Sequence, residues 1–425
     1  MVERRKLAVL VGGGPAPGIN SVIAATTIRS VLEGESVVGV QDGFEHLMAG
    51  QADCMRPLAI EDVSRIHFRG GSVLGTSRAN PTKDTELLRN TVRVLRDADV
   101  TDLVTIGGDD TAYSAMKVAE CAGGSLSVVH VPKTIDNDLD LPAEVDTFGY
   151  QTARHVGADI VKNLMTDAFT TSRWYFVIAM GRKAGHLALG IGKAAGATLT
   201  LIPEEFGSEK VPLAEVVDTL AGAVIKRASE GRRHGVAVIA EGVALCVDPA
   251  DLGGIAGIER DEHGHVRIAE IDLGDILKKA VRRRLEAFGV EATIVAKDIG
   301  YELRCADPIP FDMEYTRDLG YLAARFLLEG GSSAMVSVQG GRFVPIPFAQ
   351  MIDPQTGRTR VRLVDTNSAR YGVARRYMIR IRRDDLGNPT VMERIAAVTN
   401  VSAQRLVEEL GHVADQEPRH LVLHG

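Results

Sequence analysis

Short apolar runs recur along the chain, and each is followed by a glycine or an acidic residue and then by a helical pattern. The clearest runs are Leu7–Val11, Leu103–Ile106, Val128–Val131, Trp174–Ala179 and Val236–Ala240. Buried strands that alternate with helices are typical of parallel βαβ units. The pattern therefore predicts an α/β protein with parallel sheets.

Helical patterns follow these runs. Gly18-Ile19-Asn20 leads from a glycine-rich turn into a predicted helix, whose amino-terminal amides would face an anion. Further helices are predicted at Thr111–Ala122, Leu273–Phe288 and Arg317–Leu328. Because the last of these follows the loop at Gly300–Phe311, we expect the chain to cross between domains more than once.

Composition narrows the class of protein. The chain has 425 residues, 45% of them hydrophobic and 25% charged, which is ordinary for a globular protein of two or three domains. A net charge of −7 lacks the basic excess that sequence-independent nucleic-acid binding requires. The four cysteines have neither CxxC spacing nor the density of a disulfide framework, and no apolar segment reaches the roughly 18 residues of a membrane span. We expect a cytoplasmic protein that binds neither nucleic acid nor membrane.

Polar and charged residues gather where two of the predicted strands end. Gly107–Thr111 follows one apolar run and Pro132–Asp138 follows another, so carboxylates, glycines and one lysine reach the same edge. In an open α/β sheet the carboxyl ends of the strands form the ligand crevice. Gly12–Gly18 adds a glycine-rich turn that lets backbone amides approach a phosphate, although a plain tight turn explains it equally well. The edge suits a phosphate and its metal.

Two carboxylates are the main chemical candidates, and each has a structural alternative. Asp109 could hold Mg²⁺ while leaving coordination sites for phosphate oxygens, or it could cap the helix near Thr111, a role that Asp110 fits equally well. Asp136 could accept the proton of a sugar hydroxyl that attacks phosphorus, or it could form an Asx-turn.

Five ordered motifs resemble the phosphofructokinase family. They are Gly13–Asn20, Gly107–Thr111, Pro132–Asp138, Met180-Gly181-Arg182 and Ala240-Glu241-Gly242. The resemblance covers about Lys6 to Gly320 and implies two Rossmann-like three-layer α/β lobes of the phosphofructokinase fold, with a C-terminal extension. It also implies Mg²⁺-dependent phosphoryl transfer to the 1-hydroxyl of fructose 6-phosphate, a step of glycolysis, with the active site between the lobes.

The resemblance implies a division of the chain into lobes. Residues 1–147 are expected to form the lobe for the phosphoryl donor and Mg²⁺, completed by about 270–300. Residues 148–248 are expected to form the sugar-phosphate lobe, completed by about 301–330. The remaining residues, 331–425, form an extension that carries no interpretable motif.

Roles for single residues also follow from the resemblance. Asp136 becomes the proton acceptor, Asp109 the magnesium ligand, and Gly14 and Arg78 contacts to the donor. The residues implied to hold the sugar phosphate are Thr134, Asp136, Asp138, Met180, Gly181, Arg182, Glu241, Tyr301 and Arg304. Arg173 matches an arginine that the family sends into the neighbouring subunit's site, which implies a homodimer or a larger assembly.

Plain structural roles remain open for several of these side chains. An isolated arginine such as Arg78 or Arg182 is most often solvated, and Met180 at a strand end would normally pack in the core. Glu241 could cap the next element.

The two central motifs match the pyrophosphate-dependent branch of the family, because ATP-dependent members have glycine where this chain has Asp110 and Lys133. Asp110 would project toward the α-phosphate of ATP, and two like charges about 4 Å apart at an effective dielectric near 20 cost roughly 4 kcal/mol, or about a thousandfold in affinity. Lys133 would offset the same repulsion for pyrophosphate and stabilise the transferred phosphoryl group. The expected substrates are therefore pyrophosphate and fructose 6-phosphate. The alternatives are an ATP-dependent phosphofructokinase and a non-catalytic sugar-phosphate sensor.

Overall fold

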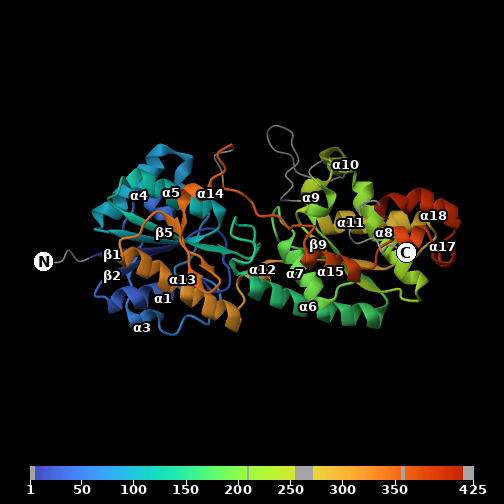
Figure 1. The fold of residues 1–425 in the computed structure, drawn as a ribbon, viewed down its shortest axis with the longest axis horizontal. Coiled ribbons are helices and arrows are strands. Elements are labelled where there is room, and N and C mark those ends of the chain that lie inside the picture. Colours follow the sequence, from blue (N-terminus) through green and yellow to red (C-terminus); the bar gives the residue numbers. More distant parts are fainter. Residues whose placement is uncertain (1–4, 208–209, 254–270, 356–358, 415–425) are drawn as a thin grey trace. The chain divides into compact units, whose positions relative to one another are not determined.

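The computed structural model describes residues 5–207, 210–253, 271–355 and 359–414 of the chain (Figure 1). These residues form two compact units. Unit 1 combines residues 1–153 with 301–362, and unit 2 combines residues 154–300 with 363–425. The chain thus passes from one unit to the other three times, as the order of helical segments predicts.

The division of the chain differs from the predicted one. The segment at about 270–300 was expected to complete the first lobe, but its strand β10 (Ile294–Ile299) pairs with β7 (Trp174–Ala179) of unit 2. The segment at about 301–330 belongs instead to unit 1, where its helix α13 (Pro310–Leu328) packs along α1 (Ile19–Leu32). Residues 331–425 are no separate extension, because the two units share them.

Unit 1 is built on an eight-stranded sheet with the order β14-β11-β5-β4-β1-β2-β3, and β6 pairs with β5. The strands from β11 to β2 are parallel, whereas β14 and β3 run antiparallel at the two edges. Their bounds are β1 Lys6–Val11, β2 Ser36–Val40, β3 Met55–Pro57, β4 Asp102–Gly107, β5 Ser127–Thr134, β6 Phe148–Gly149, β11 Ala334–Met335 and β14 Ile346–Pro347. A separate hairpin joins β12 (Val338–Gln339) to β13 (Arg342–Phe343).

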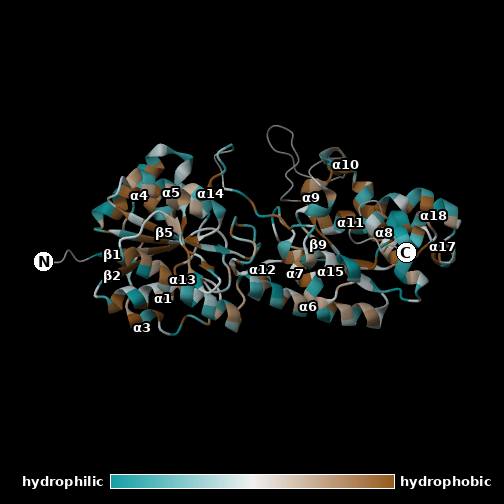
Figure 2. Ribbon diagram, in the orientation of Figure 1, coloured by the Kyte–Doolittle hydropathy of each residue, from teal (hydrophilic) through white to brown (hydrophobic). Residues whose placement is uncertain are grey.

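Helices cover both faces of this sheet, so unit 1 has three layers. Along β1, Ala8 and Leu10 pack on one face, whereas Leu7, Val9 and Val11 pack on the other. This alternation with a period of two places one apolar core on each side of the sheet. Figure 2 shows the strands inside each unit in brown, with teal residues spread over the covering helices.

Three helices of unit 1, α1, α5 and α13, were predicted from the sequence, and the other helices of the unit were not. The remaining bounds are α2 Glu45–Met48, α3 Ile60–Val63, η1 Pro81–Lys83, α4 Thr85–Asp97, α5 Asp109–Ala122, α12 Tyr301–Arg304 and α14 Phe348–Met351. The predicted helix at Arg317–Leu328 begins earlier than expected, because Pro310 occupies its first turn, where a proline costs no hydrogen bond.

Unit 2 is built on a four-stranded parallel sheet with the order β10-β7-β9-β8. Helix α7 packs on β8 and β9, and α11 packs on β7 and β10. The bounds in this unit are α6 Tyr150–Thr171, α7 His186–Ala195, β8 Leu199–Leu201, η2 Pro203–Phe206, α8 Leu213–Ser229, β9 Gly235–Ala240, α9 Val243–Cys246, α10 Pro249–Gly253, α11 Leu273–Ala287, α15 Ala369–Tyr377, α16 Arg383–Leu386, α17 Pro389–Ala396, α18 Ala403–Leu410 and η4 Gly411–Ala414. Helix α6 begins within unit 1.

The five predicted strands are all confirmed as parallel strands of the two sheets. Among the described residues, no helix is both long enough and apolar enough to cross a membrane.

Candidate active site

The glycine-rich turn and the acidic turn meet at one point of the unit 1 sheet. Strands β1 and β4 are neighbours, and the sheet grows from β1 toward β2 on one side and from β4 toward β5 on the other. This reversal is the topological switch point, where open α/β sheets bind ligands beyond the carboxyl ends of the strands. The loop after Val11 and the loop after Gly107 leave the sheet there, and Gly12 N–H donates to the Ile106 carbonyl at 2.9 Å.

Two glycines on these loops make room for one threonine. A Cβ on Gly12 would lie 2.5 Å from Thr111 Oγ1, and a Cβ on Gly107 would lie 2.3 Å from Thr111 Cβ. Any larger residue at either position would push the two turns apart. The glycines are thus needed for close packing, and Gly13 also adopts a left-handed conformation with φ of 78°.

Lys133, near the end of β5, contacts the glycine-rich turn after β1. Its side chain is only 4% exposed, and its ammonium donates a hydrogen bond to the Gly14 carbonyl. A Cβ on Gly13 would lie 3.3 Å from the same Nζ atom. Because the ammonium sits directly against the turn, a positive charge lies where the sequence predicts donor phosphates.

Arg304 also reaches this turn. A Cβ on Gly14 would lie 2.7 Å from Arg304 Nη1, and the Arg304 guanidinium lies over the ring of Tyr301 at 4.6 Å. The resemblance implies that Arg304 and Tyr301 hold the sugar phosphate, yet in unit 1 they lie beside the predicted donor turn. Tyr301 is 74% exposed, so its ring supports the guanidinium from the solvent side.

Asp109 and Asp110 lie in the first turn of α5, and the interpretation of either one as the N-cap is wrong. The N-cap is Gly108, which makes no side-chain capping hydrogen bond. Asp109 is half-buried and Asp110 is exposed. The positive end of the helix dipole stabilises carboxylates in the first turn. The same end also attracts anions, so a bound phosphate and these two carboxylates would compete for it.

Asp136 lies in a tightly bonded loop after β5. Its amide donates to Thr134 Oγ1 at 3.0 Å, and the side chains of Asp136 and Asp138 are 6% and 8% exposed. Asn137 between them is left-handed with φ of 56°, a conformation that asparagine tolerates. The turn is therefore anchored by Thr134 and Asn137.

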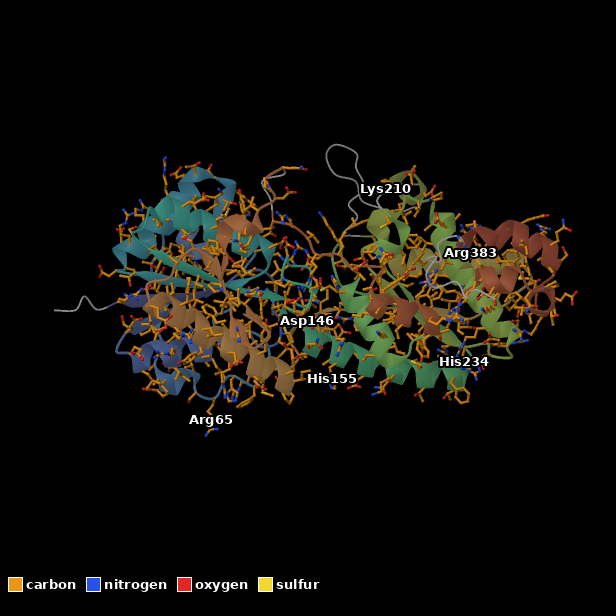
Figure 3. All side chains as sticks on the ribbon, in the orientation of Figure 1. Arg65, Asp146, His155, Lys210, His234 and Arg383 are labelled. Atoms are coloured by element: carbon orange, nitrogen blue, oxygen red, sulfur yellow. The ribbon has the colours of Figure 1, made fainter. Side chains whose placement is uncertain are left out.

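Asn137 fixes this loop through its side chain. Its amide nitrogen donates to Asp146 Oδ1 at 2.8 Å, and its Oδ1 accepts the Thr147 amide at 2.9 Å. Asp146 is labelled in Figure 3. The Thr147 hydroxyl donates in turn to the Thr134 carbonyl at 2.7 Å, which closes the loop on itself.

A fully buried histidine, His130, forms hydrogen bonds to β4 just before the turn that carries Asp109 and Asp110. Burial lowers the pKa of His130 to about 3, so its ring is neutral at physiological pH. Nε2 lies 3.0 Å from the Gly107 carbonyl, which can only accept, so Nε2 carries the proton. Nδ1 then accepts the Thr105 hydroxyl at 2.8 Å. The ring ties β5 to the end of β4 where the acidic turn begins.

A second group of predicted residues comes together in unit 2. The ends of β7 and β9 are neighbours, so Met180-Gly181-Arg182 and Glu241 leave the sheet side by side. Glu241 Oε1 accepts the amides of Gly181 at 3.1 Å and Arg182 at 2.6 Å. Glu241 thus anchors the Met180 loop rather than capping α9, whose N-cap is Gly242. Arg182 is exposed and left-handed, with φ of 53°.

Arg173 does not join this group. It precedes β7, whereas Met180 follows the same strand. Seven residues at about 3.3 Å each separate the two backbones by about 23 Å along an extended strand. No arginine side chain spans that distance, so Arg173 cannot serve the Met180 group of its own chain.

The described residues suit a magnesium ion that is held mainly by substrate. They contain no group of three or more histidine, cysteine, aspartate or glutamate side chains placed to hold a metal. Mg²⁺ is commonly bound by one or two carboxylates together with water and substrate phosphates. Asp109, half-buried at a strand end beside the glycine-rich turn, fits that mode of binding.

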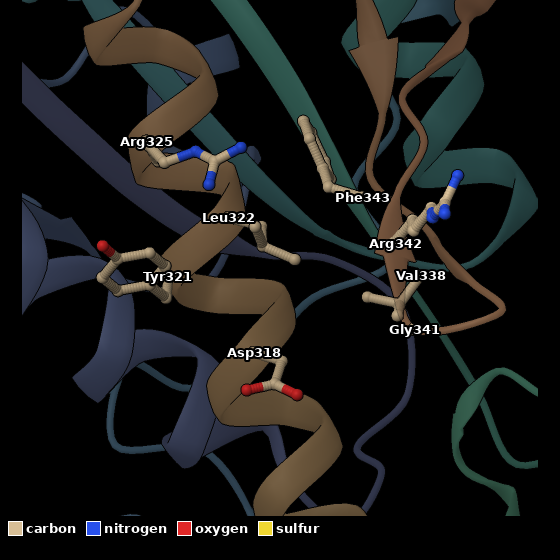
Figure 4. Close-up of a pocket in the computed structure, with 8 residues that line it drawn as sticks. All are labelled: Asp318, Tyr321, Leu322, Arg325, Val338, Gly341, Arg342 and Phe343. Carbon is tan, nitrogen blue, oxygen red and sulfur yellow. The ribbon is translucent and has the colours of Figure 1, made fainter.

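One surface pocket of about 450 Å³ lies elsewhere in unit 1, between α13 and the β12–β13 hairpin (Figure 4). Its lining residues are Asp318, Tyr321, Leu322, Arg325, Val338, Gly341, Arg342 and Phe343. The pocket contains none of the residues that the sequence predicts for the site. The Arg325 guanidinium lies over the Phe343 ring at 5.7 Å, so it holds the hairpin to the helix.

The fold and the switch point define an α/β protein with a glycine turn, an ammonium and carboxylates at the carboxyl ends of its parallel strands. The chain belongs to the phosphofructokinase family. The family model described as Phosphofructokinase matches residues 6–327.

Relatives of similar length support this assignment. The chain is 56% identical over 397 residues to a pyrophosphate--fructose 6-phosphate 1-phosphotransferase of Thermotoga maritima, covering 92% of this chain and 94% of the relative. It is 47% identical to a protein of the same name from Naegleria fowleri, covering 96% of this chain and 95% of the relative. Among solved structures, a pyrophosphate-dependent phosphofructokinase of Nitrosospira multiformis has a similar fold, with a TM-score of 0.66 at 16% identity over 94% of this chain and 93% of that one.

Proposed function

We propose that this protein transfers a phosphoryl group reversibly from pyrophosphate to the 1-hydroxyl of fructose 6-phosphate, giving fructose 1,6-bisphosphate and orthophosphate in cytoplasmic glycolysis. One observation carries the proposal: the Lys133 ammonium lies against the Gly14 turn at the switch point, next to the strand end that bears Asp109 and Asp110. The names of the two relatives with high identity support the same donor and acceptor.

Asp136 is proposed as the general base. As the sugar O1 attacks the near phosphorus of pyrophosphate, its proton moves to the Asp136 carboxylate and the bridging P–O bond breaks. Orthophosphate leaves with the electron pair of that bond. Asp136 is only 6% exposed and its backbone amide is bonded to Thr134 Oγ1, so the main chain that carries the carboxylate is fixed for this transfer.

Lys133 and Asp109 are proposed to stabilise charge during the transfer. The Lys133 ammonium would contact the transferred phosphoryl group, because its carbonyl partner Gly14 belongs to the turn that faces the donor. Asp109 would hold Mg²⁺, which neutralises diphosphate oxygens when it is bound. Gly14 and Arg78 complete the proposed donor side, and Arg78 is exposed at the edge of the turn, where Thr76 donates to the Gly13 carbonyl.

The residues proposed to contact the acceptor come from the Asp136 loop, the Met180 loop and the segment at Tyr301. Thr134 and Asp138 would contact the sugar from the Asp136 loop. Met180, Gly181, Arg182 and Glu241 would contact it from unit 2, with Tyr301 and Arg304 at its phosphate. Arg173 is proposed to act in the site of a neighbouring subunit, since it lies at the far end of β7 from the Met180 loop.

Asp110 is proposed to select the donor. It is exposed in the first turn of α5, where an approaching nucleotide would meet its charge before reaching the glycine turn. Pyrophosphate is shorter and would reach the Lys133 ammonium without placing a further phosphate beside Asp110.

A coupled assay on the purified protein tests the proposal. Fructose 6-phosphate is offered with pyrophosphate or with ATP, each with and without Mg²⁺, and the reverse reaction is assayed with fructose 1,6-bisphosphate and orthophosphate. We expect Mg²⁺-dependent turnover in both directions with pyrophosphate and at most traces with ATP. Equal or better use of ATP would refute the donor, and sugar-phosphate binding without turnover on either donor would favour the sensor.

A further inference from the structure

We infer that Arg362 is a positioning residue for the Asp136–Asp138 loop, so that a segment far along the chain aligns the proposed base. The inference rests on the proposed function of Asp136. It assigns a positioning role to Arg362, which lies in the part of the chain where the sequence offers no interpretable motif.

The Arg362 guanidinium makes five hydrogen bonds to this loop and the residues after it. Nε donates to the Asn137 carbonyl at 3.1 Å, and Nη2 donates to Asn137 Oδ1. Nη1 donates to the carbonyls of Leu141 at 3.3 Å, Pro142 at 3.0 Å and Val145 at 2.8 Å. One side chain thus gathers the main chain on both sides of the loop.

The backbone of the same segment runs along the loop. The Arg362 amide donates to the Asp138 carbonyl at 2.8 Å, and Val361 forms an antiparallel bridge with Leu139. These contacts hold the loop from outside the sheet, as a short added strand would. The segment therefore fixes both the side chain and the carbonyls around Asn137.

The contacts of Arg362 with Asn137 affect the proposed base because of where Asn137 lies in the loop. Asp136 and Asp138 are its direct neighbours, and its left-handed backbone with φ of 56° sets the direction in which each of them leaves the loop. Arg362 holds Asn137 through both its carbonyl and its side-chain oxygen. If Asn137 relaxes, both aspartates move, and a displacement of about 1 Å in a catalytic group costs about 10²-fold in rate.

Only an arginine suits this place. A guanidinium presents five N–H donors in a rigid planar fork, whereas a lysine ammonium presents one compact charge with three donors. Lysine could therefore satisfy some of the carbonyls but could not bond Asn137 and Val145 at once.

Arg360 provides a matched control on the same segment. It reaches Asp140 at 3.5 Å through an ion pair in which both side chains are largely exposed, with side-chain exposures of 51% and 39%. Such a pair contributes little to structure. Replacing Arg360 removes an arginine two residues from Arg362 while leaving the Asn137 contacts in place.

The test compares wild type with Arg362→Met, Arg362→Lys, Arg362→Ala and Arg360→Met in the pyrophosphate assay. We expect kcat to fall about 10²-fold in Arg362→Met and less in Arg362→Lys, with KM for pyrophosphate changed by less than about threefold, because the glycine turn is held separately. Added guanidinium should restore part of kcat to Arg362→Ala and none to Arg360→Met. A purely stabilising arginine would give neither the split between kcat and KM nor the rescue.

Hydrogen exchange gives a readout that does not depend on activity. Amides of residues 136–147 should exchange faster in Arg362→Met than in wild type, with those of β1 and β4 unchanged. Wild-type kcat in Arg362→Lys together with unchanged exchange would overturn the inference, even if the other variants fail to fold. A wild type that is inactive with pyrophosphate would instead refute the proposed function, and the exchange comparison would still decide the role of Arg362.

Discussion

Asp110 and Lys133, two charges of opposite sign on neighbouring strand ends, have different surroundings. Lys133 is 4% exposed and bonded to the Gly14 carbonyl, whereas Asp110 is exposed in the first turn of α5. The fold thus fixes the ammonium in a buried place, whereas the Asp110 carboxylate lies at the solvent-exposed surface of the turn. Donor choice is expected to depend on Asp110 more than on Lys133, which should serve the chemical step.

Because Asp110 is exposed, solvent weakens the expected repulsion between its carboxylate and the phosphates of ATP. Like charges about 4 Å apart repel by about 1 kcal/mol in water and about 4 kcal/mol at an effective dielectric near 20. We therefore expect Asp110→Gly to raise kcat/KM for ATP by between about fivefold and about a thousandfold. Steady-state kinetics with both donors checks this.

Asp109→Gly is the matched control for the donor switch. It also removes one first-turn charge, but from the proposed metal ligand, so it should lower kcat/KM for both donors together. An Asp110→Gly protein that uses ATP no better than wild type would show that shape rather than charge excludes the nucleotide.

At the scale of elements, His130 of β5 is hydrogen-bonded to Thr105 and Gly107 of β4 and so joins the two strands. Its neutral ring bridges Thr105 and Gly107, and burial keeps its pKa near 3. In the unfolded chain the same group has a pKa near 6.5 and takes up a proton as the pH falls. Protonation therefore favours the unfolded state, and the stability that the neutral ring contributes is complete above pH 6.5 and is lost progressively between 6.5 and 3.

This difference in pKa predicts an acid-sensitive fold. Between pH 7 and pH 5, wild type should lose about 2 kcal/mol more of its unfolding free energy than His130→Gln, which cannot take up the proton. Urea unfolding followed by circular dichroism measures this, because the single tryptophan, Trp174, lies in unit 2 and would not report on β4 and β5. All other histidines contribute equally to both proteins, so identical acid dependence would mean that His130 is not buried as a neutral ring.

At the scale of the whole molecule, the position of Arg173 makes the proposed assembly testable. Arg173 and the Met180 loop lie at opposite ends of β7, so one chain cannot bring them to the same sugar phosphate. In a symmetric dimer, however, each subunit can supply its arginine to the partner's site. Activity would then depend on two chains.

Mixing two inactive variants tests this dependence. Arg173→Ala and Asp136→Ser should each lower kcat by about 10²-fold or more, the latter by loss of proton abstraction. Hybrids formed by refolding them together should recover about a quarter of the wild-type sites, because half of random dimers are hybrids and one of their two sites is intact. Asp136→Ser mixed with Lys133→Ala should recover nothing, since both defects lie in the same subunit's site, and a lack of recovery in both mixtures would place Arg173 outside any shared site.

Much of the fold could be predicted from local pattern, and the misses have local causes. The apolar runs give five of the strands, β1, β4, β5, β7 and β9, because a buried parallel strand is apolar on both faces and leaves a clear mark in sequence. The early start of α13 was missed because Pro310 reads as a helix breaker until its place in a first turn is known. The cap assigned to the acidic pair was wrong for a related reason, since a glycine can be an N-cap without any side-chain signal.

Sequence alone determined the class of the protein and the residues of its strand-end loops, because glycines, acids and a lysine in fixed order can be recognised without coordinates. Tertiary structure alone decided which segments complete each unit, that His130 supports the acidic turn, and that Arg362 grips the Asn137 backbone across more than two hundred residues of chain. Those contacts depend on how strands pair and where the chain returns. A hydrogen bond between residues far apart in the chain produces no repeating pattern in the sequence, because only the folded sheet brings its two partners together.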